Sequence, residues 1–408
     1  PQTRRVLGVL VMLGSSGCER DEPVATAAET NPLFVDPATR DFSENPALLE
    51  RVLASPHGYL RFINIPFSQE VCRRAEHLLD GVPLLNLHGD AHVEQYAVTD
   101  LGRGLTDFDD SSKGPAVIDI LRLAVSLRLA SELNGWQDQA DAIFDRFLAG
   151  YRTALLDPSA VVPAPAVAGR LMERFIYDRE EYFDWIESVV DVVPEEEADR
   201  LIEAMSPYIA TMQQQHPELD PRYFEVVEVS YLRLGIGSAL DRKYLVRIRG
   251  GEDQPKDDVF LELKQVRNLQ AIDCVSVGQG NEPFRILIGQ SLIAYQPYGL
   301  LGYVVFDDLT FWIHAWVDNY AEASILDSFQ SPEELGEVAY DIGLQLGRGH
   351  PNQVAAGLDL QVRQTVLRQL DRDEEEIDAI SRELARLVRE AWQSFKSAQA
   401  RAGAPVSG

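Results

Sequence analysis

The chain has 408 residues, of which 45% are hydrophobic and 25% charged, a composition typical of a globular protein and not of a disordered one. This length corresponds to about two to three domains. The 65 Asp and Glu outnumber the 37 Lys and Arg and give a formal net charge of −28. Binding of a nucleic-acid backbone requires clustered basic side chains, so we expect no nucleic-acid partner.

The N-terminus has the pattern of a secretory signal. Two arginines precede an apolar run at 6–13, and small residues at 14–17 lead to Cys18. The order positive, apolar, small is typical of export, and a cysteine after small residues is similar to a bacterial lipobox. We expect residues 1–18 to be a signal with lipidation at Cys18, which makes the protein an exported lipoprotein whose only link to a membrane is the lipid. If this signal does not function, the protein is cytoplasmic.

Residues 19–45 are rich in Ala, Thr, Pro and Asp and have no periodicity, which predicts a linker. Two helices are expected after it. The first covers Pro46 to Ala54, and the second covers Ser68 to Leu79, with Ser68 as its N-cap and Pro66 just outside it.

Acids and histidines are concentrated in the segment that follows. It contains His88-Gly89-Asp90-Ala91-His92 and, further on, Thr106-Asp107-Phe108-Asp109-Asp110. Taken singly, such acids are usually loop caps and such histidines are usually structural. The density of the cluster favours chemistry instead.

Apolar runs flank this cluster at 82–87 and 105–108, with glycines between them. This pattern predicts a hairpin that brings Asp90 and Asp107 to the same end. Two carboxylates from adjacent loops suit Mg²⁺, which completes its shell with water and substrate phosphates.

With the following Gly114-Pro115 and Asp-x-x-Arg-Leu-Ala at 119–124, these motifs resemble the catalytic core of aminoglycoside phosphotransferases and protein-kinase-like enzymes. More closely, the chain resembles the bacterial DUF2252 family, whose function is not established. The resemblance implies that Asp90 is the catalytic base or orients the acceptor, and that Asp107 holds Mg²⁺. It also implies that Asp119 tethers its helix, which begins near Ala116, to the catalytic loop.

The remaining members of the expected site surround these carboxylates. Gln95 stands where the family motif has a metal-binding Asn, and either Gln95 or Asp109 would help Asp107 to hold the metal. His88 and His92 complete the catalytic group. We expect His92 to brace the loop, because neutral imidazole is a poorer Mg²⁺ ligand than carboxylate.

Helical periodicity dominates up to residue 220, and the part from 46 to 220 is expected to be the catalytic-loop-containing part of a helical large lobe. After the helix that contains Asp119, the expected helices are Gln137 to Leu155, Ala166 to Tyr177 and Glu195 to Gln215.

The periodicity then changes to that of strands, and residues 221–320 are expected to form a small β lobe that covers the nucleotide. Its expected strands are Phe224 to Leu234, Lys243 to Arg249, Val259 to Val266, and a hairpin of Tyr303 to Phe306 with Thr310 to Trp316.

Two features of this lobe suit phosphate. The connection with Gly235, Gly237 and Ser238 lets backbone amides approach phosphate oxygens, although a pair of glycines is also common in a plain hairpin turn. Lys264, inside an apolar strand, matches the position of the kinase lysine; the alternative is that it points to solvent by alternation. The expected helix from Phe284 to Tyr295 lacks the Glu that pairs with this lysine in kinases, and Glu282 is the nearest substitute.

Residues 321–402 are expected to supply the helix Pro332 to Gly349 and a final helix pair from Arg363 to Ala402 that complete the large lobe. In ordinary kinases the small lobe comes first, whereas here it follows the catalytic loop. We therefore expect an α+β, two-lobed, protein-kinase-like fold in circularly permuted order.

Three functions remain open at this point. The first is a phosphotransferase that binds ATP, or another nucleotide, and Mg²⁺ between the lobes and transfers phosphoryl to an unknown hydroxyl acceptor. The second is a catalytically silent, pseudokinase-like binding lipoprotein. The third is a metal-dependent hydrolase that uses the same histidines and aspartates. Whether Cys72 and Cys274 form a disulfide is also open.

Overall fold

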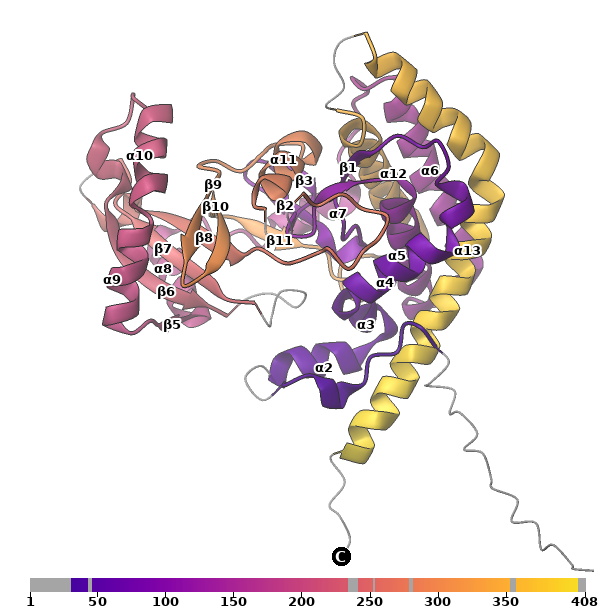
Figure 1. Ribbon diagram of the computed structural model, residues 1–408, viewed down its shortest axis with the longest axis horizontal. Helices are drawn as coiled ribbons and strands as arrows, with labels where there is room; N and C mark the ends of the chain where they lie inside the picture. The colour runs from indigo at the N-terminus through magenta and orange to yellow at the C-terminus, as the bar shows by residue number, and fades with distance from the viewer. Residues whose placement is uncertain are drawn as a thin grey trace, which may run out of the picture.

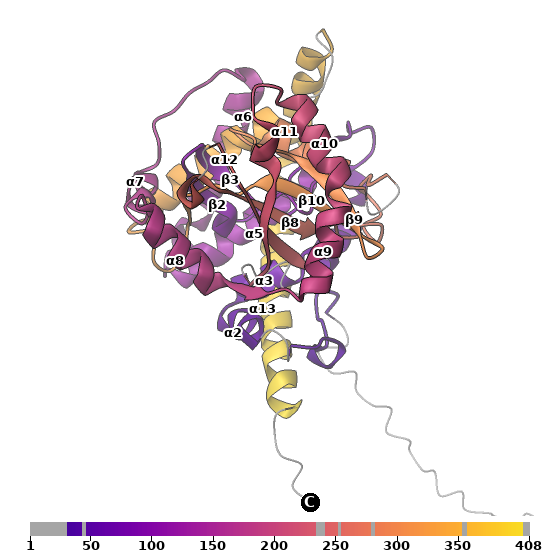
Figure 2. The same ribbon diagram turned by 90° about the vertical axis from the view of Figure 1, so that its left-hand side faces the viewer.

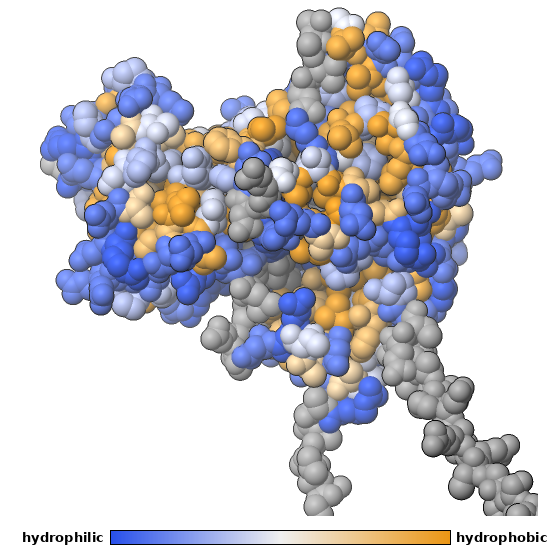
Figure 3. Space-filling view, viewed as in Figure 1, coloured by the Kyte–Doolittle hydropathy of each residue, from blue (hydrophilic) through white to orange (hydrophobic). Residues whose placement is uncertain are grey.

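The computed structural model describes residues 31–42, 46–233, 241–251, 254–278, 282–352 and 357–402. These residues form an α+β protein whose sheets are all antiparallel, so the expected class is confirmed. Figure 1 shows a helical part, with the long helix α13 along its outer edge, and a sheet part at the opposite end. Figure 3 shows hydrophilic residues along α13 and at the rim of the sheet part.

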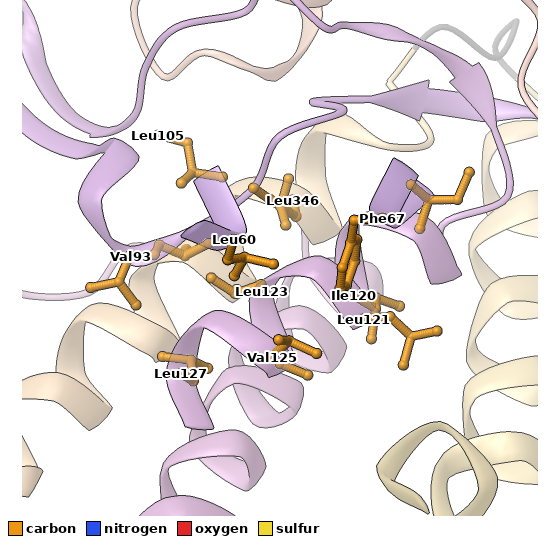
Figure 4. Close-up of a cluster of buried hydrophobic side chains, with 14 of the residues drawn as sticks. Leu60, Phe67, Val93, Leu105, Ile120, Leu121, Leu123, Val125, Leu127 and Leu346 are labelled. Carbon is orange, nitrogen blue, oxygen red and sulfur yellow. The ribbon is translucent and has the colours of Figure 1, made fainter. Parts of the chain in front are cut away.

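The helical part is organised around α5, whose residues 118–131 are all buried. Most of these residues are apolar, as expected of a helix in the interior of a protein, and the buried polar residues Asp119 and Arg122 have hydrogen-bond partners. Figure 4 shows Leu121, Leu123 and Val125 of α5 among side chains from α3, α4 and α12. The helices of this part are α2 (Pro46–Ala54), α3 (Pro56–Phe62), α4 (Asn64–Arg74), α5 (Val117–Leu133), α6 (Ala140–Leu156), α7 (Ala166–Met172), α12 (Pro332–Gly349) and α13 (Asp359–Ala402).

Several helix predictions are confirmed, α2 and α12 to the residue. The helix predicted from Ser68 to Leu79 is displaced, because α4 begins at Asn64 and ends at Arg74. Pro66 was placed outside this helix but lies in its first turn, where a proline removes no intrahelical hydrogen bond.

Two other predictions give the wrong number of helices. The helix expected over 195–215 is two helices, α9 (Glu195–Ala204) and α10 (Ser206–Gln215), with Pro207 in the first turn of α10. The expected final pair is the single 44-residue helix α13. The sequence of α13 has no glycine or proline to interrupt it.

The sheet part is built on six strands in the order β5-β6-β7-β8-β10-β9. The strands are β5 (Val190–Val192), β6 (Val226–Leu232), β7 (Lys243–Ile248), β8 (Val259–Gln265), β9 (Gly302–Phe306) and β10 (Leu309–Ala315). Helices α9 and α10 cover the outer face (Figure 2), and α8 (Arg179–Val189) packs on the inner face at Leu245 and Phe260. The strands predicted after residue 221 are confirmed within two residues at each end, whereas β5 and α8 were not predicted.

Two small sheets lie between these parts. Strand β1 (Leu85–Leu87) pairs with β4 (Ser112–Gly114), and β2 (Tyr96–Thr99) pairs with β3 (Gly102–Leu105) and β11 (Tyr320–Glu322). The predicted hairpin between 82–87 and 105–108 is therefore wrong. Its error was to take the glycines before residue 105 for a turn, although they lie inside β3.

A helix and a disulfide complete the region around these small sheets. Helix α11 (Phe284–Ile293) follows β8, and a disulfide joins Cys72 of α4 to Cys274. Residues 31–42, expected within a linker, bury Leu33 and Phe42 in the helical core. The predicted signal and lipidation site at Cys18 lie outside the described residues. No helix in the described ranges is both long and apolar enough to span a membrane.

Candidate functional site

A cleft of about 420 Å³ lies between the inner face of the sheet part and the helical part. The sheet part contributes Lys243, Glu262, Lys264, Trp312 and His314. The other side contributes Arg51, Arg61, Gln95, Thr106, Asp107, Arg174, Tyr320 and Glu322. Charged and aromatic side chains from distant parts of the sequence therefore meet here.

The alternation of strand β8 explains why Lys264 faces this cleft. Leu261 and Leu263 pack in the core under α9 and α10, so Glu262 and Lys264 point to the opposite face. That face lies against the helical part, and Lys264 is only 6% exposed. Lys264 is therefore buried and does not point to solvent.

Two carboxylates from the loop after β3 hold the Lys264 ammonium. Its Nζ lies 2.5 Å from Asp107 Oδ1 and 2.6 Å from Asp109 Oδ2. Burial opposes the charge on Lys264, but these two aspartates raise its pKa well above the usual value. The sequence predicted that all three residues belong to the site, and the structure brings them together.

The two aspartates have different protonation properties. Burial disfavours the ionised form of both, but Lys264 holds the pKa of Asp107 well below its usual value. Burial and the neighbouring Asp107 raise the pKa of Asp109 to about 7. Two acids beside one ammonium therefore behave as a coupled pair in which Asp109 is the member that holds a proton more readily.

Several contacts fix the conformation of this loop. Asp107 has a φ of +58°, a left-handed conformation that is costly for a residue with a side chain. Gln95 Nε2 lies 3.3 Å from Asp107 Oδ2, and Trp312 Nε1 donates to Asp109 Oδ1 at 2.7 Å. The buried Arg285 donates to the carbonyls of Asp109 and Ser111. The loop is therefore held by partners from both parts of the molecule.

The loop that contains His88 and Asp90 is tied to the start of α5. Asp119 accepts hydrogen bonds from the backbone N–H groups of His88, at 2.7 Å, and Gly89, at 2.9 Å. The tether expected for Asp119 is thus confirmed. The ring of His88 is held between backbone groups, because Nε2 donates to the Thr106 carbonyl at 2.8 Å and Nδ1 accepts from the Asp90 N–H at 3.3 Å.

Asp90 is buried beside a guanidinium that also comes from α5. Arg122 contacts Asp90 Oδ1 through Nη2 at 2.6 Å and through Nε at 3.0 Å, and the guanidinium lies over the Phe67 ring. Burial raises the pKa of Asp90 to about 6 despite the attraction of Arg122. A carboxylate with this pKa is ionised at neutral pH and close to the range in which general bases operate.

His92 lies behind Asp90, in the interior of the helical part. Its Nε2 is 3.8 Å from Asp90 Oδ2, and its ring meets the edge of His57 at a centroid distance of 5.5 Å. Burial, together with the charges of Arg61 and Arg122, lowers its pKa well below the usual value, so the ring is neutral. Within the described residues neither ring nitrogen has a hydrogen-bond partner. The bracing role expected of His92 therefore stays a prediction.

The donor set near Lys264 fits Mg²⁺ in its chemistry. Asp107 and Asp109 supply hard oxygen ligands, and a cationic group, the Lys264 ammonium, already binds between the two carboxylates. The Gln95 amide would supply a further oxygen only after rotation, because its nitrogen faces Asp107. Over the part of the chain that the structure describes, no group of three or more His, Cys, Asp or Glu is arranged to hold a metal ion. A magnesium site would therefore consist of two carboxylates with an amide, water and ligand oxygens.

The expected phosphate loop with Gly235, Gly237 and Ser238 lies outside the described residues. Glu282, the candidate partner for Lys264, lies on the surface beside Gly278. Lys264 pairs with Asp107 and Asp109 instead.

Sequence reasoning missed several cleft residues, among them Lys243, Glu262 and His314. Glu262 binds His314 Nε2 at 3.1 Å, and the register of β8 with β10 places these residues opposite one another. Lys243 is the cross-strand neighbour of Lys264. The spacing of Glu262 and Lys264 by two on one strand was the available signal, but the partners follow only from the strand register.

Comparison with known families identifies the chain. The model of the DUF2252 family, described as an uncharacterized protein conserved in bacteria, matches residues 41–167 and 170–398. The chain therefore belongs to this family. Neither the curated proteins nor the solved structures gave a significant match.

Proposed function

We propose that this protein is a kinase-like phosphotransferase that binds a nucleotide such as ATP, with Mg²⁺, in the cleft and transfers phosphoryl to a hydroxyl acceptor. One observation carries the proposal. Lys264, on strand β8 of the six-stranded antiparallel sheet, lies 2.5 Å from Asp107, which follows a His-Gly-Asp loop, although 157 positions separate the two residues. Kinase-like enzymes combine a lysine and a metal-binding aspartate of this kind.

The roles of the residues follow from their positions. Lys264 binds phosphate oxygens, and Asp107, with Asp109 and Gln95, holds the metal. Mg²⁺ supplies neutralisation of the phosphate charge when it is bound. Asp90 orients the acceptor hydroxyl and accepts its proton, and Arg122 fixes the Asp90 carboxylate by its contact at 2.6 Å. The tether from Asp119 keeps this loop in place.

A circularly permuted kinase-like fold is part of this proposal. In the kinase-like order, a large-lobe helix that ends in a histidine leads into the catalytic loop. Here the end of α12 lies beside β1, because the Asn86 N–H donates to the His350 carbonyl at 3.0 Å. His350 Nε2 also lies 3.1 Å from Asp119. The two segments are neighbours in space although 264 positions separate Asn86 from His350, and this supports a permuted order.

The structure offers less support for a metal-dependent hydrolase. Such a site would need lone pairs of His88, and both ring nitrogens of His88 are engaged by the backbone. We also propose that the protein is exported. The disulfide between Cys72 and Cys274 supports this location, because disulfides persist mainly in oxidising compartments.

Thermal unfolding with a panel of nucleotides and Mg²⁺ or Mn²⁺ tests the proposal, since a ligand that binds only the folded state raises the unfolding midpoint. We expect a rise with a nucleoside triphosphate and metal together, and its loss in Asp107→Asn. A rise with Zn²⁺ or Mn²⁺ alone, and none with any nucleotide, would refute it. Binding without any turnover would favour the silent, pseudokinase-like alternative.

A further inference from the structure

The charge of the cleft differs from that of the chain. Over the whole chain, 65 acidic residues outnumber 37 basic ones, whereas the cleft lining has more basic than acidic side chains. Lys243 and Lys264 account for the basic charge on the sheet side. Arg51, Arg61 and Arg174 account for it on the other side, and the proposed nucleotide and metal roles use none of these arginines.

Of the three arginines, Arg61 is the one whose charge interacts with that of Asp90. Burial opposes the charge on Arg61, but attraction by Glu94, Glu322 and Asp90 raises its pKa. Burial raises the pKa of Glu322, and the charges of Arg61 and Arg51 oppose this rise. The backbone carbonyl of Glu322 accepts a hydrogen bond from Arg174 Nη1 at 3.3 Å. All three arginines therefore lie around Glu322, and Arg61 links this group to Asp90.

Most of their donor groups remain available to a ligand. Arg61 donates from Nη1 to Glu94 at 2.9 Å, and no other described residue accepts from its side chain. No carboxylate in the described ranges lies within 4.0 Å of the guanidinium of Arg51 or Arg174, and both side chains are exposed. A guanidinium has five N–H donors in a planar fork that matches an oxyanion. Three of them in one cleft form a site for a ligand with a phosphate or carboxylate group.

Local packing fixes the backbone of Arg51 and the side chain of Arg61. A Cβ at Gly58 would lie 2.3 Å from the Arg51 carbonyl oxygen, so only glycine allows α2 to pack this closely on α3. Glu94 holds Arg61 and is itself placed by His57 Nδ1 at 3.4 Å and by the Ile325 N–H at 3.2 Å. Pre-organised donors lose less conformational entropy on binding.

From this arrangement we infer that the acceptor substrate is itself an anion, a hydroxyl compound with a phosphate or carboxylate group that Arg51, Arg61 and Arg174 bind while its hydroxyl lies at Asp90. This inference rests on the proposed phosphotransferase function. It assigns the arginines to acceptor recognition and leaves the nucleotide to Lys264.

Inorganic phosphate is the probe for this site. The unfolding midpoint is measured with increasing phosphate at constant ionic strength, with and without Mg²⁺ and a non-hydrolysable ATP analogue. The variant is Arg51→Gln/Arg174→Gln, with Arg51→Gln alone as a milder form. The matched control is Arg40→Gln/Arg368→Gln, which removes the same charge from exposed positions outside the cleft.

We expect phosphate to raise the midpoint of the wild type and the control, and the cleft variant to lose most of this rise. The shift caused by the nucleotide analogue should be the same in all three proteins. Equal phosphate shifts in all three, or none in any, would overturn the inference. A phosphate shift that depends on the arginines, without any nucleotide shift, would mean that the phosphotransferase proposal fails while the anion site stands.

Discussion

Replacement of Lys264 by methionine tests whether the Lys264 ammonium neutralises the carboxylates of Asp107 and Asp109. The ammonium lies within 2.6 Å of both Asp107 and Asp109 and is buried. Methionine keeps the length and the apolar stem of the side chain and removes the charge. Loss of one partner from a buried ion pair costs about 3–5 kcal/mol, so the free energy of unfolding of Lys264→Met should fall by about that amount in a metal-free buffer.

Magnesium should restore part of this loss. Without the ammonium, a divalent cation becomes the natural counter-ion for the two carboxylates. A ligand at a hundred times its dissociation constant stabilises the folded state by about 2.7 kcal/mol. We therefore expect Mg²⁺ to stabilise Lys264→Met much more than the wild type when no nucleotide is present.

Chemical denaturation followed by tryptophan fluorescence, with EDTA or with Mg²⁺, measures both effects. Lys256→Met is the control, because Lys256 is exposed and lies outside the cleft. The reasoning is refuted if Mg²⁺ stabilises the wild type and Lys264→Met equally, since the lysine and the metal would then not share the two carboxylates.

Three further substitutions test other parts of the site. Asp119→Ala leaves the buried N–H groups of His88 and Gly89 without an acceptor. It should therefore lower the free energy of unfolding by about 2–6 kcal/mol, whereas Asp138→Ala, at an exposed position, should leave it unchanged; similar denaturation curves would contradict the tether. Asp90→Asn should reduce nucleotide turnover by about 10²–10⁴-fold and leave nucleotide affinity unchanged. Wild-type turnover should rise with pH through about 6, and a flat profile would argue against a base at Asp90. Because the pKa of Asp109 is raised to about 7, the stability that its protonated form contributes is complete at low pH and is lost as the pH rises from about 4 to 7. Asp109→Asn should therefore be more stable relative to the wild type at pH 8 than at pH 5 in thermal melts, and a difference that does not change with pH would exclude this titration.

Local sequence signals predicted much of the fold. Helix α12 follows Ser331 and has proline in its first turn, and it ends in a glycine, so both of its bounds were readable. Strand β9 alternates in burial over most of its length, whereas β8 has buried residues on both faces, so its alternation lies in which side each residue faces. The hairpin at Asp307 and Asp308 has positive φ at both turn residues, a conformation that aspartate tolerates better than most residues.

Predictions failed where tertiary pairing decides the structure. Strand β1 pairs with β4 and not with β3, because β2 intervenes and takes β3 as its partner. Alternating patterns identify strands but not their neighbours. The sequence offered only Glu282, just before the following helix, as a glutamate partner for Lys264, whereas its partners come from the Asp107 loop.

The sequence predicted which motifs belong to the site but not how their side chains are arranged in space. The His88 and Asp107 segments stood out because acids and histidines are rarely so dense. Nothing local indicated that His314 would meet Glu262, since their distance depends on the pairing of β10 with β8. The arginine side of the cleft was also invisible, because Arg51 and Arg174 are ordinary surface residues in the sequence.

The central claim is that Lys264 and Asp107 bind one nucleotide with Mg²⁺. Calorimetric titration of a non-hydrolysable ATP analogue in the presence of Mg²⁺ tests it most directly, with wild type, Lys264→Met and Lys256→Met in parallel. We predict saturable binding of one nucleotide per chain by the wild type and Lys256→Met, and an affinity lower by at least about tenfold for Lys264→Met, because a lost charge-assisted contact is worth about 1.5–3 kcal/mol. No binding by the wild type, or equal affinity for all three proteins, would contradict the claim.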